Sequence, residues 1–97
     1  METALNVIRT EKHYETVVEG HKAFIEYMLS GNSVYLTHTE VAPELEGKGV
    51  AKKLVETVLK MIEEEGKQLV PLCPFVASYL KRHPEWKRIL AEGYNVQ

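Results

Sequence analysis

The sequence predicts a mixed α/β (α+β) domain: an antiparallel meander, then a strand–helix–strand crossover, then a C-terminal helix. Three observations support this fold class. The first forty residues hold short β-branched and aromatic segments separated by turn residues. The apolar period then changes from two to that of a helix at Val50. A further β-type segment follows the helix, and neighbouring strands joined by a helix are parallel.

Four strands are expected before the helix. The first spans residues 4–9, and a hairpin over residues 14–29 turns at residues 19–21. The second strand of the hairpin alternates apolar and polar residues, which is the pattern of a half-buried strand. The "SGNS" segment, residues 30–33, is a turn, and residues 34–41 form the fourth strand.

The second half begins with an amphipathic helix. Its apolar residues form a broad stripe from Val50 to Ile62, and Gly66 is a natural C-terminal stop. The strand expected over residues 67–73 contains Pro71, so it should be an edge, a bulge or a point of separation. The next helix should span residues 74–83, and the "EWKRIL" segment is expected to add a last turn or helix.

Composition bounds the class of protein. The chain of 97 residues suits one domain, residues 1–97, and its 44% apolar and 27% charged content is that of a globular protein. A net charge of −2 argues against nucleic acid as the main partner. The lack of aspartate argues against loop-carboxylate metal sites, and no metal is expected. One cysteine, no signal peptide and no membrane-length apolar run predict a cytoplasmic protein of undefined oligomeric state.

The helix start carries Gly47-Lys48-Gly49 where serine or aspartate would cap it more firmly. Glycines allow close approach of the backbone, and the free N–H groups of a first helical turn bind anions, most often phosphate. Lys48, Lys52 and Lys53 would add positive charge to the same anion. The alternative is a flexible loop whose glycines only permit a tight turn, since the segment is not a Walker motif.

The segment "APELEGKGVAKKLVE" resembles the acyl-CoA cradle of the GNAT superfamily of N-acyltransferases, whose signature is Arg/Gln-x-x-Gly-x-Gly/Ala. The matching positions are Glu46, Gly49 and Ala51, with Gly47 as a frequent extra glycine. The "HTEV" and "CPFVASYLKRHPE" segments on either side resemble a small single-domain branch of the superfamily. The resemblance covers roughly half of the chain, from His38 to about Trp86.

The resemblance implies a mixed sheet whose parallel strands, residues 34–41 and 67–73, splay apart to admit the pantetheine arm of acetyl-CoA. The diphosphate would lie on the N–H groups of residues 47–51. Glu46 departs from the family pattern, and its carboxylate would repel a diphosphate unless it points away or pairs with Lys48. The residues expected to bind acetyl-CoA are Val41, Gly47, Lys48, Gly49, Val50, Ala51 and Lys52.

Four residues are candidates for the chemistry. Cys73 should cap the last helix, where the helix dipole favours a thiolate, although a lone cysteine is usually buried and inert. His38 and Glu40 share a strand face and either is a candidate general base, or else a simple surface residue. Tyr79 matches, about one residue out of place, the tyrosine that protonates the CoA sulfur in many GNAT enzymes. It is otherwise a half-buried helix residue.

The function predicted is transfer of an acetyl group from acetyl-CoA to a primary amine of a small molecule or peptide, directly or through Cys73. The alternative is a module that binds CoA or another partner without transferase turnover. A third possibility is a partner-binding domain that has lost CoA. The identity of the acceptor amine is not encoded in any recognisable motif.

Overall fold

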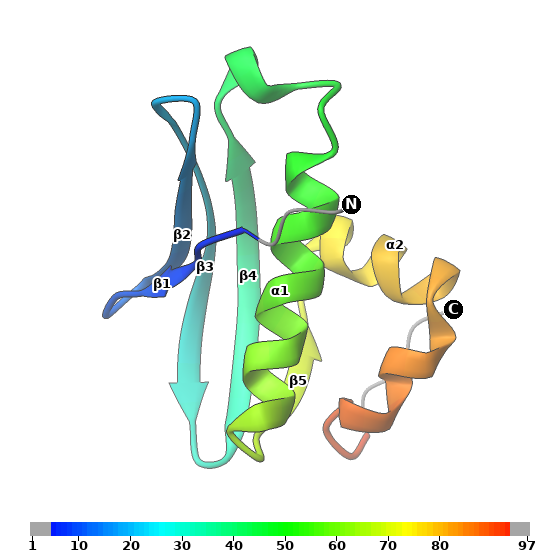
Figure 1. Ribbon diagram of the computed structural model, residues 1–97. Helices are drawn as coiled ribbons and strands as arrows, with labels where there is room; N and C mark the ends of the chain where they lie inside the picture. Colours follow the sequence, from blue (N-terminus) through cyan, green and yellow to red (C-terminus); the bar gives the residue numbers. More distant parts are fainter. Residues whose placement is uncertain (1–4, 94–97) are drawn as a thin grey trace.

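The computed structural model describes residues 5–93, which form one five-stranded mixed sheet with helices on it and beside it (Figure 1). Strands that follow one another in sequence are also neighbours in the sheet. The first three pairings are antiparallel and the last one is parallel. The predicted fold class is therefore confirmed.

The first four strands form the predicted antiparallel meander. The turn between the second and third strands contains Glu19 and Gly20, whose φ angles of 53° and 80° are both positive. Two positive φ angles in a two-residue turn match the twist of a β-hairpin. The strands are β1 (Ile8–Arg9), β2 (His13–Val18), β3 (His21–Ser30) and β4 (Ser33–Val41).

β1 is shorter than the strand predicted over residues 4–9. Its pairing with β2 covers only Ile8 and Arg9. Upstream of it, the Thr16 hydroxyl donates a hydrogen bond of 2.9 Å to the carbonyl oxygen of Asn6. A side chain of β2 thus contacts this backbone in place of a ladder bond, and Ala4 lies outside the described residues.

The crossover consists of α1 (Val50–Glu64), which contacts β3, β4 and β5, and of β5 (Gln68–Pro71), which pairs in parallel with β4. β5 ends earlier than the predicted residue 73. After Pro71, the N–H groups of Leu72 and Cys73 both turn to the carbonyl oxygen of Leu36, so the ladder stops there.

The C-terminal part lies beyond β5, the edge strand (Figure 1). α2 (Pro74–Arg82) begins at proline and ends one residue before the predicted position 83. A 3₁₀ helix, η2 (Pro84–Ile89), follows as the predicted last turn. Leu90 then forms an isolated parallel bridge with Leu69 on the open side of β5.

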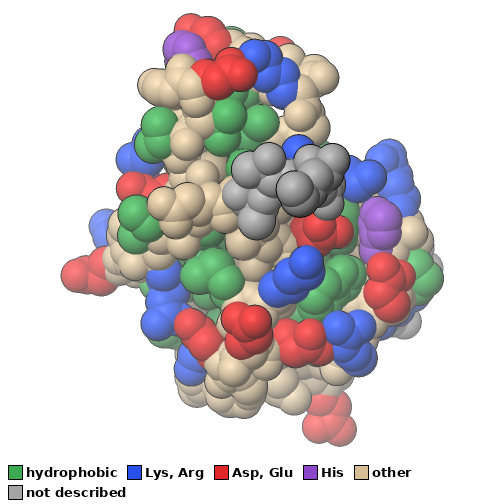
Figure 2. Space-filling view, in the orientation of Figure 1, with side chains coloured by type: hydrophobic (Ala, Val, Ile, Leu, Met, Phe, Trp, Pro, Cys, Tyr) green, Lys and Arg blue, Asp and Glu red, His purple; other side chains and the backbone are tan. Residues whose placement is uncertain are grey.

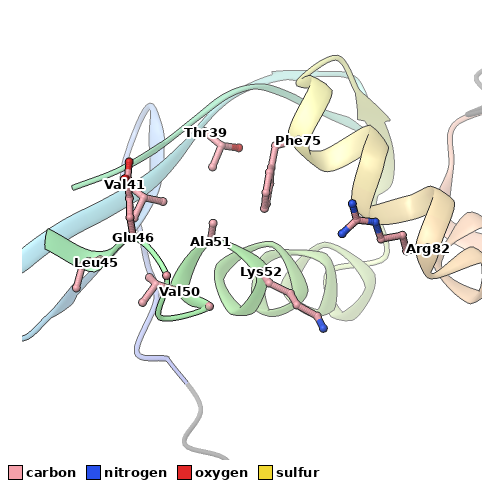
Figure 3. A pocket seen from close by; sticks show the side chains of 11 residues that line it. Thr39, Val41, Leu45, Glu46, Val50, Ala51, Lys52, Phe75 and Arg82 are labelled. Atoms are coloured by element: carbon pink, nitrogen blue, oxygen red, sulfur yellow. The ribbon is translucent and has the colours of Figure 1, made fainter. Parts of the chain in front are cut away.

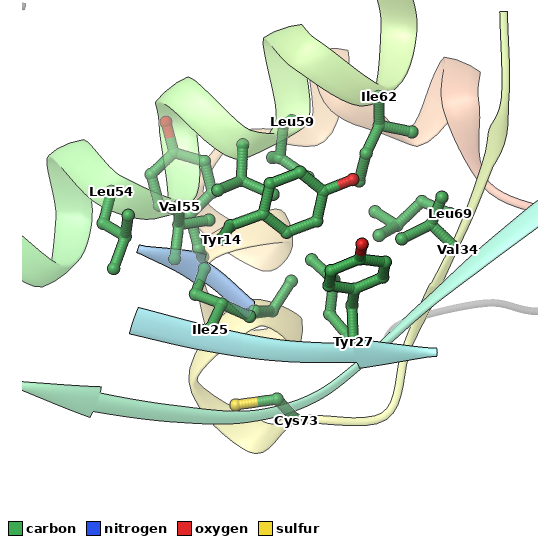
Figure 4. Close-up of a cluster of buried hydrophobic side chains, with 14 of the residues drawn as sticks. Tyr14, Ile25, Tyr27, Val34, Leu54, Val55, Leu59, Ile62, Leu69 and Cys73 are labelled. Carbon is green, nitrogen blue, oxygen red and sulfur yellow. The ribbon is translucent and has the colours of Figure 1, made fainter. Parts of the chain in front are cut away.

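The core lies between the sheet and α1 (Figure 4). The apolar stripe of α1, including Leu54, Leu59 and Ile62, is fully buried against Tyr14 and Ile25 of the sheet. Each such side chain contributes about 1.5–3 kcal/mol by leaving water, so this stripe anchors the helix firmly. Within residues 5–93, no helix combines the length and apolar character needed to cross a lipid bilayer.

The face of the molecule seen in Figure 2 carries acidic and basic side chains that are mixed rather than separated. Apolar side chains lie between them in small groups. The charge of this face is therefore balanced over short distances, in keeping with a net charge of −2.

Candidate functional site

The start of α1 has an unusual cap. Gly49 holds the N-cap position with φ 73° and ψ 14°, in the left-handed region, and no side chain bonds to the first turn. An ordinary N-cap residue is extended and offers a side-chain oxygen to the helix. A short 3₁₀ turn, η1 (Pro43–Leu45), and Gly47, at φ 82°, lead the chain into this position.

The backbone N–H groups of this loop are mostly unpaired. Among the described residues, those of Gly47, Gly49, Val50, Ala51 and Lys52 have no acceptor. The N–H group of Lys48 differs, because it donates to the carbonyl oxygen of Leu45 at 3.2 Å. Several donors and the positive end of the helix dipole therefore point out of the same turn, an arrangement that suits an anion.

A β-bulge decides which side chains of β4 face α1. Tyr27 of β3 pairs with Leu36, whereas the preceding residue, Glu26, pairs with His38. Thr37 is therefore an extra residue in β4. The side chains beyond it exchange faces. Thr39 consequently shares the face of the buried Ile25 and the α1 side of the sheet.

β4 and β5 separate beyond their fourth pair, Leu36 with Pro71. Beyond Leu36, β4 pairs only with β3, and its other edge has no strand partner in the described part of the chain. At the base of the resulting gap, the Thr39 Oγ1 atom lies 3.2 Å from the Cys73 Sγ atom. The splayed strands implied by the resemblance are therefore present, with β5 at the edge of the sheet.

A pocket of about 520 Å³ lies between β4, the start of α1 and α2 (Figure 3). Thr39 of β4 and Phe75 of α2 face one another across it, with Ala51 of α1 between them. Arg82 of α2 and Lys52 of α1 also line the pocket and carry positive charge, although the Lys52 side chain extends away from Thr39 and Phe75. The lining residues are Thr39, Val41, Leu45, Glu46, Gly47, Gly49, Val50, Ala51, Lys52, Phe75 and Arg82.

Six of the seven residues predicted to bind acetyl-CoA line this pocket, and Lys48 does not. The Lys48 ammonium donates to the Glu19 carboxylate in the β2–β3 turn at 2.6 Å. That cation holds the pKa of Glu19 below its usual range through the hydrogen bond and the Coulomb attraction. Lys48 therefore does not neutralise the carboxylate of Glu46, and Glu46 lines the pocket.

His38 and Glu40 share a face of β4, as predicted, with the His38 Nε2 atom 3.3 Å from the Glu40 Oε1 atom. Both side chains are more than half exposed. Neither side chain lines the pocket, because the bulge at Thr37 turns both to the sheet face opposite α1.

Tyr79 bridges the two helices. Its hydroxyl donates to the Glu56 carboxylate of α1 at 3.1 Å, and its ring stacks on His83. Burial, and then the bond to Glu56, raise the pKa of Tyr79 to about 12. Tyr79 lines a smaller neighbouring pocket that shares Lys52, Phe75 and Arg82 with the larger one.

Cys73 occupies the predicted N-cap of α2, without a side-chain cap bond. It is only 4% exposed and does not line the pocket. Its Sγ atom contacts Thr39, which does line the pocket. The thiol is thus placed one side chain away from the space that a ligand would occupy.

Sequence reasoning missed Thr39, Leu45 and Phe75 as lining residues. Thr39 was hidden by the bulge, which reverses the alternation read from the sequence. The sequence carries a weak signal for Phe75, because a large apolar side chain in the first turn of this helix can contact little of the core. In the structure Phe75 is 41% exposed.

A mixed sheet whose two parallel strands part beside an uncapped, glycine-rich helix start is the fold that the GNAT resemblance implies. The solution structure of a GCN5-like protein from Staphylococcus aureus matches this chain with a TM-score of 0.70 at 24% identity, over 93% of this chain and 91% of the other. At this identity the likeness shows the fold. A comparison with curated proteins found no match.

The model of the family described as GCN5-related N-acetyl-transferase matches residues 13–89. This range contains the meander from β2 onward, the glycine loop, the strand gap and both helices. The protein therefore belongs to this family of acyltransferases.

Proposed function

We propose that this protein transfers an acetyl group from acetyl-CoA to a primary amine of a small molecule or peptide. The family gives the class of reaction, and the site is the basis for assigning the donor. The observation that carries the proposal is the set of unpaired N–H groups at residues 47 and 49–52, which open into a pocket that continues to the gap between β4 and β5.

The residues of this loop fit a diphosphate. The first turn of α1 presents several N–H donors together, and Gly47 and Gly49 have nothing within 4 Å of where a Cβ would stand, so the backbone there is open to a ligand. Lys52 and Arg82 add positive charge, while Lys48 would contribute only on leaving Glu19. When bound, acetyl-CoA would supply the activated acyl group.

The strand gap suits the extended arm of the same molecule. β4 beyond Leu36 has an edge on the side of β5 without a strand partner in residues 5–93, and an extended chain can bond to such an edge. Val41 and Ala51 offer apolar surface along this path. The donor would then lie with its acyl end near Thr39.

The chemistry is assigned to the same four side chains that the sequence singled out, three of them for proton transfer and Cys73 for an acyl relay. The His38–Glu40 pair would take a proton from an amine approaching through the opposite sheet face, directly or through water. Tyr79, whose pKa of about 12 keeps it protonated, would act as an acid only on leaving Glu56. Cys73 would accept an acetyl group only if Thr39 moved aside, so direct transfer needs fewer rearrangements.

One observation favours a second candidate function. None of Cys73, His38, Glu40 and Tyr79 lines the larger pocket, although a group that acts on a bound thioester must reach it. A module that binds acetyl-CoA and a partner without turnover also fits this arrangement.

Calorimetry with acetyl-CoA, followed by a free-thiol assay across a panel of amines, separates these functions. We expect micromolar binding and thiol release with at least one primary amine. Binding without release for any amine, unchanged in Cys73→Ala, would favour the module. No heat with acetyl-CoA at millimolar concentration would exclude both.

A further inference from the structure

On its sheet side, the pocket is bounded by Thr39, and the side chain of Cys73 lies directly behind Thr39. Thr39 comes from β4, and Cys73 follows β5 at the start of α2. The N–H group of Cys73 donates to the Leu36 carbonyl oxygen at 2.8 Å, which fixes the backbone beside the gap. The Oγ1 and Sγ atoms are 3.2 Å apart, so the two side chains meet at the base of the gap.

The order of the two side chains follows from their exposure. Thr39 lines the pocket, whereas Cys73 is 4% exposed and does not. A group that moves from the α1 loop toward the strand gap therefore meets Thr39 first, with Cys73 directly behind it. Phe75 and Ala51 bound the space on the other sides (Figure 3).

We propose that Thr39, backed by Cys73, sets the length of the acyl group that the protein accepts, admitting two carbons and excluding four. This inference rests on the proposed function, because it assumes an acyl-CoA donor. Protein interiors are close-packed, and a longer chain would have to displace Thr39 into the space filled by Cys73. An acyl chain that does not fit the space is discriminated against by about tenfold or more.

Calorimetry with CoA, acetyl-CoA, propionyl-CoA and butyryl-CoA tests the inference. For the unmodified protein we expect butyryl-CoA to bind about tenfold or more weakly than acetyl-CoA. Thr39→Ala removes two heavy atoms from the wall and should reduce that ratio to about threefold or less. Cys73→Ala makes room behind Thr39 and should shift the ratio in the same direction by a smaller factor.

Thr39→Val is the matched control. It nearly keeps the volume of the side chain and replaces the hydroxyl with a methyl group, so the butyryl-to-acetyl ratio should stay that of the unmodified protein. A melting curve establishes whether each variant folds. If Thr39→Ala does not fold, Cys73→Ala provides an independent test.

The outcomes separate this inference from the proposed function. If no CoA thioester and no CoA binds the unmodified protein, the proposed function fails. If acetyl-CoA binds but butyryl-CoA binds equally well, or if the ratio is the same in Thr39→Ala and Thr39→Val, the length limit lies elsewhere and this inference fails alone.

Discussion

Both ends of α1 carry a glycine with a left-handed backbone, but the backbone groups are hydrogen-bonded at one end and unpaired at the other. At the C-terminal end, Gly66 has φ 71°, its N–H group donates to Glu63, and the next N–H group, of Lys67, donates to Ile62. These two bonds form a Schellman motif. At the N-terminal end, Gly49 has φ 73°, and the N–H groups around it are left without acceptors in the described chain.

The difference shows what each glycine does. Gly66 ends the helix, and the bonds around it satisfy the last carbonyl groups of the helix. The carbonyl oxygen of Gly66 accepts a hydrogen bond of 3.1 Å from the side-chain amide of Asn32. Gly49 begins the helix in a conformation that turns unpaired donors toward a pocket. The donors at the N-terminal end are therefore left to solvent or to a ligand, whereas the bonds at the C-terminal end are made within the chain.

The largest effect expected is loss of binding on Gly49→Glu. The substitution strains a left-handed position and places a carboxylate in the pocket beside the helix start. We expect affinity for acetyl-CoA to fall by at least about 100-fold, which is ~2.7 kcal/mol. Calorimetry measures the loss, and a melting curve establishes that the variant folds.

Gly66→Glu is the matched control for that variant. Its φ of 71° imposes the same backbone strain, about 1–2 kcal/mol of stability. Affinity for acetyl-CoA should be retained, because Gly66 does not line the pocket at the start of α1. Equal losses of affinity in the two variants would show that the ends do not differ as we describe.

A second prediction concerns the middle of α1, where Glu56 accepts a hydrogen bond from Tyr79. The folded protein keeps the Tyr79 proton up to a pKa of about 12, whereas the unfolded chain loses it near 10. Stability from this group is therefore complete below pH 10 and is lost as pH rises toward 12. The loss should be ~2 kcal/mol.

Urea unfolding at pH 9 and pH 11.5 measures this loss, with Tyr79→Phe as the comparison. The variant should lack the part of the decline that belongs to Tyr79, while the other tyrosines contribute to both proteins. Equal declines would mean that the link between α1 and α2 does not depend on the protonated phenol.

The smallest effect tests the charge at the open end. Glu46 lines the pocket, so Glu46→Gln should tighten acetyl-CoA binding by about fivefold at low salt, or ~1 kcal/mol, and by less at high salt. Glu64→Gln removes the same charge near the other end of α1 and should leave affinity unchanged. A similar gain in both variants would indicate a general charge effect and no repulsion specific to the pocket.

Most of the fold could be predicted from the sequence. The turn at residues 19–20, the amphipathic stripe beginning at Val50 and the stop at Gly66 are local signals, and each holds in the structure. The ends of β1 and β5 were predicted too far out. A strand ends where its backbone hydrogen bonds to the neighbouring strand end, and that neighbour is distant in sequence.

The sequence by itself determined that a helix begins without a side-chain cap after two glycines, because backbone freedom and capping chemistry depend on residue type. Only the tertiary structure decided which side chains meet at that helix start. One extra residue in β4, Thr37, exchanges the faces of the strand, so that Thr39 enters the pocket and His38 and Glu40 leave it. The pairing of β3 with β4 sets that bulge, and no local pattern records it.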